Sequence, residues 1–116
     1  RMDFIKQLNW RYAAKRMTGV KIPSDKLERI LEATRLSASS LGLQPYQILV
    51  LENPEIRNKI FPAANNQKQI LESSAVLIYC AIEKLTEVHA QEFISRIVRT
   101  RNISEESLSG FRTSII

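Results

Sequence analysis

The pattern of apolar and polar positions predicts a chain of short helices interrupted by two strands. Apolar residues recur at helical spacing in residues 2–9, 24–37 and 86–101. Two other runs are almost continuously apolar, residues 46–51 (YQILVL) and 75–82 (AVLIYCAI), and such runs are typical of buried strands. The predicted order is therefore helix, loop, helix, strand, two helices, strand and two helices.

Capping residues indicate where several of these helices begin and end. Asn53-Pro54-Glu55 combines a cap, a proline at the first helical position and an acid in the first turn. Ser24 is a good N-cap for the second helix, and Asn9 is a plausible C-cap for the first. We expect a further short helix at residues 65–72 and a last one opening at residues 104–106.

The connection between the two strands suggests how they pair. It holds 23 residues, 52–74, and includes helix, which favours a right-handed parallel crossover. The second strand should be buried on both faces, which makes Cys80 an inert core thiol. Two strands form a poor sheet by themselves. We therefore expect a chain that is incomplete or that completes its sheet with another chain.

Composition limits the class of protein. The chain has 116 residues, 44% hydrophobic and 25% charged, which fits one small globular domain or part of a larger one. A single cysteine excludes a disulfide framework and a multi-cysteine metal site, and it fits a reducing, cytoplasmic location. No apolar stretch approaches the roughly 18 residues of a transmembrane helix.

The net charge of +5 lies entirely in residues 1–22, which hold six basic side chains and one acidic one. A basic N-terminus is found in targeting presequences, in nucleic-acid or membrane arms, on solvated helix faces and in anion sites. Asp3 and the lack of a run of serines argue against a presequence here. Spaced charges interleaved with Phe4, Ile5, Leu8 and Trp10 make the nucleic-acid arm the weakest of these. The anion site, with cations converging on a phosphate, is the most specific reading.

Side chains that carry out catalysis are hard to find. The sequence has neither GxxxxGK[ST] nor GxGxxG. Its one histidine, His89, is predicted in mid-helix at the surface, and Glu105-Glu106 suit the positive end of a helix. We predict no catalytic side chain and no metal site.

Three polar groups remain, each in a loop or at the end of an element, where binding residues usually lie. They are residues 11–16, residues 37–40 ahead of Gln44-Pro45, and residues 65–69. Arginine and lysine bind phosphate, and amide side chains can both donate to and accept from the edge of a heterocycle. Taken singly, each group is more often a surface, loop or turn sequence.

Together and in this order, the three groups resemble the nitroreductase family of FMN-dependent oxidoreductases. The resemblance covers most of residues 3–82. It rests on Arg11-Tyr12-Ala13-Ala14-Lys15, on the run from Ala38 to Tyr46 followed by QILVL, and on Asn66-Gln67-Lys68-Gln69 ahead of the apolar run ending at Ala81. It implies an α+β fold, a three-layer α/β/α arrangement with a central mixed sheet. Residues 1–116 would be a single partial domain, the N-terminal half of that fold.

The resemblance also implies a cofactor site. Arg11, Tyr12, Ala13 and Lys15 fall where the family binds the phosphate, ribityl chain and pyrimidine edge of FMN. Asn66 and Gln69 fall where it meets the flavin ring. Ser39 and Ser40 fall where the second subunit of an intertwined homodimer contacts the same flavin.

The implied activity is hydride transfer from NADH or NADPH through FMN to a nitroaromatic, a quinone or a similar acceptor, in a ping-pong cycle. Its partners are a second copy of the chain and the small-molecule acceptor, with no nucleic acid and no membrane.

The sequence departs from the family pattern in three ways. These are Ala38 and Leu41-Gly42 in the serine loop, Gln69 where some members have lysine, and a chain about half as long. A truncated or divergent member that only binds flavin or dimerises is the alternative.

Overall fold

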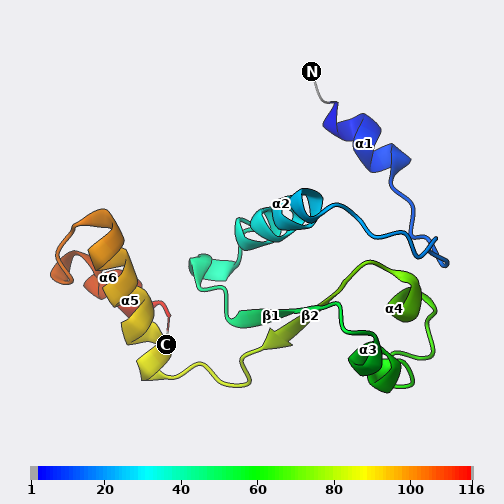
Figure 1. The fold of residues 1–116 in the computed structure, drawn as a ribbon. Coiled ribbons are helices and arrows are strands. Elements are labelled where there is room, and N and C mark those ends of the chain that lie inside the picture. The colour runs from blue at the N-terminus through cyan, green and yellow to red at the C-terminus, as the bar shows by residue number, and fades with distance from the viewer. Residues whose placement is uncertain (1–2, 116) are drawn as a thin grey trace. The chain divides into compact units, whose positions relative to one another are not determined.

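The computed structural model describes residues 3–115, whose helices and strands follow the predicted order (Figure 1). The helices and strands are α1 (Phe4–Trp10), α2 (Ser24–Arg35), the 3-10 turn η1 (Ser40–Gly42), β1 (Tyr46–Leu51), α3 (Pro54–Ile60), α4 (Gln69–Glu72), β2 (Val76–Ala81), α5 (Glu87–Arg101), η2 (Glu106–Leu108) and α6 (Ser109–Thr113).

Helix boundaries confirm some of the capping predictions and correct others. Asn53 is the N-cap of α3, and its side-chain oxygen accepts a hydrogen bond from the Ile56 N–H at 3.1 Å. Asn9 is not a C-cap, because it lies inside α1 and donates from Nδ2 to the Ile5 carbonyl at 3.0 Å. The cap position belongs to Arg11. Similarly, α2 begins at Ser24 itself rather than after it.

The two strands pair with each other and form a two-stranded sheet. The prediction of a parallel crossover is wrong. The Ile82 N–H, just after β2, donates to the Pro45 carbonyl, just before β1, at 2.9 Å, so the strands are antiparallel. The connection contains two short helices, α3 and α4, of seven and four residues. It therefore reverses direction instead of carrying one long crossover helix.

The second strand is also less buried than its composition predicted. No residue of β2 is fully buried, and Tyr79 is 57% exposed. Cys80 is exposed, so it is not a core thiol. An apolar run predicts burial only when neighbouring elements cover it, and β1 is its one strand partner in the described part of the chain.

The described chain divides into two compact units. The first contains residues 3–27 and 50–78, and the second contains residues 28–49 and 79–115. Each unit includes part of each strand. The candidate cofactor residues at 11–15 and 66–69 all belong to the first unit, whereas Ser39 and Ser40 belong to the second.

The second unit holds the two buried apolar side chains of the described residues, Ala90 and Ile94 of α5. The predicted apolar face of this helix is thereby confirmed. Phe93 of α5 packs near Phe111 of α6, with ring centroids 6.1 Å apart. Outside this contact, Gln91 of α5 donates to Glu105 at 2.9 Å, so polar bonds also hold the end of the chain to α5.

The loop between α3 and α4 was expected to be helical from residue 65, and this expectation is wrong. Asn65 and Asn66 both have φ of 53°, in the left-handed region, and α4 begins only at Gln69. Asparagine tolerates this region better than most residues. The pair therefore turns the chain back, and the Asn66 N–H donates to the Phe61 carbonyl at 3.1 Å.

Candidate functional site

The first candidate segment, residues 11–15, follows α1 directly and is neither helix nor strand. The Arg11 N–H closes the helix on the Gln7 carbonyl at 3.1 Å. The Ala14 N–H then donates to the Tyr12 carbonyl at 3.2 Å, a tight local turn centred on Ala13. The side chains of Arg11, Tyr12 and Lys15 are all exposed, and Tyr12 retains 83% of its surface.

The third candidate segment, residues 65–69, contacts the first through Gln69. Gln69 Nε2 donates to the Ala14 carbonyl at 3.2 Å, across 55 residues of sequence. The structure thus brings two of the predicted groups together in one unit. Asn66 lies three residues upstream of Gln69, and its side chain is exposed.

One turn further along α4, Glu72 makes a charged contact with the first segment that no local sequence pattern predicts. Arg16 Nε lies 2.8 and 3.0 Å from the two oxygens of Glu72, and Nη2 lies 2.7 Å from Oε1. The Met17 N–H donates to the same carboxylate at 2.9 Å. The Arg16 hydrogen bond first, and the Met17 amide second, lower the pKa of Glu72 below its ordinary value of 4.5.

Ser74 extends the contact to the end of the loop before α2. Its hydroxyl accepts from the Ile22 N–H at 2.8 Å and donates to the Val20 carbonyl at 3.2 Å. Lys21 Nζ donates to the Ser74 carbonyl at 3.1 Å. Residues 14–22 and 69–74 therefore form one polar seam, which we call the N-terminal seam. Glu72 and Ser74 look like ordinary surface residues in the sequence, because nothing in it marks partners more than 50 residues away.

This arrangement leaves two cations free for a ligand. Within residues 3–115, no acid lies at ion-pair distance from Arg11 or Lys15, whereas Arg16 is engaged by Glu72. An arginine fork and a lysine ammonium on one short segment can hold a phosphate. Asn66 and Gln69 add amide groups that can donate and accept. This donor set matches what the phosphate and heterocycle of FMN require.

Ser39 and Ser40 lie on a tight turn of the second unit. The Ser39 hydroxyl accepts from the Gln44 N–H at 2.8 Å, and its carbonyl accepts from the Gly42 N–H at 3.0 Å. Leu41, Gly42 and Gln44 have φ of 54°, 72° and 45°, so the turn passes through the left-handed region three times. The Ser39 hydroxyl is used to shape the turn, while the Ser40 side chain is exposed.

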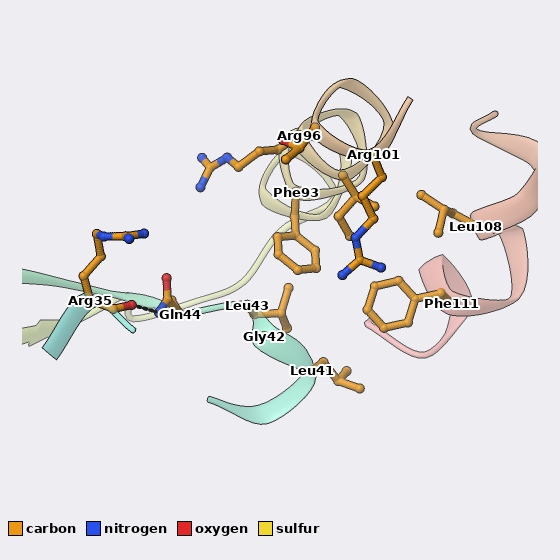
Figure 2. A pocket seen from close by; sticks show the side chains of 12 residues that line it. Arg35, Leu41, Gly42, Leu43, Gln44, Phe93, Arg96, Arg101, Leu108 and Phe111 are labelled. Atoms are coloured by element: carbon orange, nitrogen blue, oxygen red, sulfur yellow. Dashed lines mark hydrogen bonds between the residues drawn. The ribbon is translucent and has the colours of Figure 1, made fainter. Parts of the chain in front are cut away.

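A cavity of about 700 Å³ lies beside this turn, within the second unit (Figure 2). Figure 2 shows that its lining comes from residues 41–44, from Phe93 of α5 and from Phe111 of α6. Arginine side chains from α2 and α5, Arg35, Arg96 and Arg101, also line it. Aromatic rings beside cations suit a flat ligand that carries negative charge.

The remaining candidates give no catalytic or metal site. His89 lies in the first turn of α5 and not in mid-helix. Its Nδ1 accepts from the Thr86 N–H at 3.2 Å and completes a capping box.

No group of three or more metal-ligating side chains is found among residues 3–115. The helices in this part of the chain are all too short or too polar to cross a membrane.

Comparison with known sequences places these residues in a family. The model of the Nitroreductase family matches residues 8–106. A "putative NAD(P)H nitroreductase" of Staphylococcus haemolyticus is 35% identical over 89% of this chain and 47% of its own length. The Major NAD(P)H-flavin oxidoreductase of Aliivibrio fischeri is 31% identical over 88% of this chain and 50% of its own length. The chain spans about half the length of the curated relatives that it matches.

Solved structures agree on the fold. A nitroreductase-like protein of Streptococcus mutans superposes with a TM-score of 0.77, at 19% identity, over 97% of this chain and 56% of that one. A "putative nitroreductase" of Exiguobacterium sibiricum, solved in complex with FMN, gives a TM-score of 0.72 at 25% identity, over 99% of this chain and 55% of that one. The predicted α+β fold is thus confirmed as part of the nitroreductase fold, and the chain belongs to the nitroreductase family.

Proposed function

We propose that this protein is an FMN-dependent oxidoreductase that uses NADH or NADPH to reduce a nitroaromatic, a quinone or a similar acceptor. The observation that carries the proposal is the bond from Gln69 Nε2 to the Ala14 carbonyl. It joins the two segments that family resemblance assigns to FMN. The printed names of the relatives and the FMN complex of a structural neighbour support the same chemistry.

The residues of the first unit have distinct roles in this proposal. Arg11 and Lys15 bind the phosphate and the pyrimidine edge, and Lys15 stabilises negative charge that develops there. Tyr12 and Ala13 line the ribityl chain, while Asn66 and Gln69 donate to and accept from the ring. When bound, FMN itself supplies the hydride chemistry. No side chain has to act as a nucleophile.

The direct test uses the visible absorbance of flavin. We expect the purified protein to carry FMN or to take it up when it is added. Its flavin absorbance should bleach with NADH or NADPH and return when a quinone such as menadione is supplied. Alternating reduction and reoxidation of this kind supports the ping-pong order. A protein that takes up no FMN contradicts the proposal.

The alternative function is a non-catalytic module that binds flavin or dimerises. It predicts a yellow protein whose flavin is not reduced by NADH or NADPH. The same spectra therefore separate the two functions. The proposal includes a cytoplasmic location, because a reducing compartment suits a chain with one exposed cysteine, Cys80.

We also propose that the protein works as a homodimer in which Ser39 and Ser40 of one copy serve the flavin site of the other. The proposal is supported by α1, whose Phe4, Ile5 and Leu8 are 70%, 64% and 49% exposed. An apolar stripe of this kind is more stable when another surface covers it. Analytical ultracentrifugation should show a dimer, and Phe4→Asp should shift it toward the monomer. A protein that is monomeric and still binds one FMN per chain would contradict the proposed homodimer.

A further inference from the structure

Arg57 of α3 is the one charged side chain that is buried in the described part of the chain, with 4% of its surface exposed. Its Nε donates to the Ile70 carbonyl at 2.6 Å. Its Nη2 donates to the Ser73 carbonyl at 2.6 Å and to the Ser73 hydroxyl at 3.2 Å. Within residues 3–115, no carboxylate lies at ion-pair distance from it.

The guanidinium therefore binds the backbone carbonyls of Ile70 and Ser73 instead of a carboxylate. The last carbonyls of a helix have no partner inside the helix and carry partial negative charge. The planar arginine fork binds three oxygens of Ile70 and Ser73 in fixed directions at the end of α4. An apolar side chain of similar volume would avoid burying a charge, but it would leave the carbonyls of Ile70 and Ser73 without this donor. What the arginine adds is a defined position for residues 70–73.

That position matters because the same short helix makes the N-terminal seam. Gln69 binds the Ala14 carbonyl, and Glu72 binds Arg16 and the Met17 amide. Arg57 thus binds the backbone at the end of α4. The side chains of Gln69 and Glu72 on the same helix bind residues 14–17. Any shift of α4 moves Gln69 together with the chain that carries Lys15.

We infer that Arg57 is a positioning residue, which fixes α4 so that the segments at residues 11–15 and 66–69 are set for FMN. The inference rests on the proposed FMN site. Arg57 itself binds no cofactor atom. It acts on the FMN site through Gln69 and through the N-terminal seam.

The test compares Arg57→Met and Arg57→Lys with the wild-type protein. Lys59→Met is the matched control, because Lys59 lies on the same helix with its side chain exposed. The dissociation constant of FMN is measured by quenching of flavin fluorescence, and the environment of the bound flavin by visible circular dichroism at saturating FMN. Far-ultraviolet circular dichroism reports the fold. Hydrogen exchange reports the backbone of residues 69–74.

We expect Arg57→Met to raise the dissociation constant of FMN at least about tenfold, because a displaced Gln69 and residues 11–15 would lose hydrogen bonds to the charged cofactor. Arg57→Lys should recover part of the affinity and still alter the visible dichroism of the bound flavin. Lys59→Met should match the wild type. If Arg57→Met does not fold, Arg57→Lys decides the question alone.

Wild-type affinity and dichroism in Arg57→Lys, with unchanged exchange at residues 69–74, overturn the inference. A loss of exchange protection spread evenly over the first unit also overturns it, since that marks a purely structural role. If the wild-type protein binds no FMN, the proposed function fails, whereas the exchange measurement still tests whether Arg57 fixes α4.

Discussion

The guanidinium of Arg16 engages both carboxylate oxygens of Glu72, with its Nε 2.8 and 3.0 Å from them, across 56 residues of sequence. The Met17 amide binds the same carboxylate. Glu72 therefore organises the chain that follows the candidate cofactor segment. Both members of the pair are accessible to water, so the contact orders the loop more than it stabilises the whole fold.

Replacing Glu72 should loosen this loop locally. In Glu72→Ala the Met17 amide loses its acceptor, so we expect its hydrogen exchange to accelerate about tenfold or more, while α5 exchanges as before. Exchange measured by NMR or mass spectrometry checks this. Glu52→Ala removes an exposed acid of the first unit that makes no ion pair within residues 3–115, and it should leave Met17 unchanged. Equal acceleration in both variants would show that the carboxylate is not the acceptor.

The same contact should depend on pH. Because Arg16 and the Met17 amide lower the pKa of Glu72, the ionised carboxylate adds stability that is fully present above pH 4.5, the ordinary value. That contribution is lost as the pH falls through the lowered pKa. The Met17 amide shift, followed by NMR, should therefore titrate below pH 4.5. A midpoint at or above 4.5 would contradict the contact.

Arg11 is expected to retain FMN through its charge. Arg11→Ala should weaken FMN binding about tenfold or more, because a hydrogen bond to a charged group contributes roughly 1.5–3 kcal/mol. The ratio of flavin to protein absorbance after purification and a fluorescence titration both measure the effect. Lys6→Ala is the control, since it removes an exposed cation of α1. Full retention in Arg11→Ala would exclude Arg11 from the site.

The core of the second unit should be sensitive to truncation at Ile94, which has no exposed surface. Ile94→Ala should lower the free energy of unfolding by about 2–5 kcal/mol through lost burial and a cavity. Val88→Ala on the same helix, where 65% of the side chain is exposed, should cost less than about 0.5 kcal/mol. Urea unfolding followed by circular dichroism gives both values. Similar losses at the two positions would mean that Ile94 is not the packing centre.

Local sequence was enough to predict the elements that depend on their own residues. The run YQILVL matches β1 from Tyr46 to Leu51, and Asn53 caps α3 as expected. The apolar face of α5 also follows from its period. In each case, side chains within a few residues of one another decide the structure.

Features that depend on distant residues were not predictable in this way. The direction of β2 relative to β1 is set by how α3, α4 and the left-handed pair Asn65-Asn66 turn the chain, and not by the length of the connection. The burial of Arg57 depends on carbonyls 13 and 16 residues away. In the candidate site, the roles of Gln69 and Lys15 are predictions from the family resemblance, and the Glu72 contact that orders the neighbouring loop has no local signature in the sequence.

The N-terminal seam also has a thermodynamic consequence. Its bonds are polar, and apolar side chains along it, such as Met17 and Val20, are already 41% and 74% exposed. Detaching it uncovers little new hydrocarbon, so it should add little to the heat capacity of unfolding, which grows with newly hydrated apolar surface. Release of α5, which buries Ile94, should account for much more of that heat capacity. The part of the chain proposed to bind the cofactor can therefore come loose with little change in heat capacity, ahead of the main transition that releases α5.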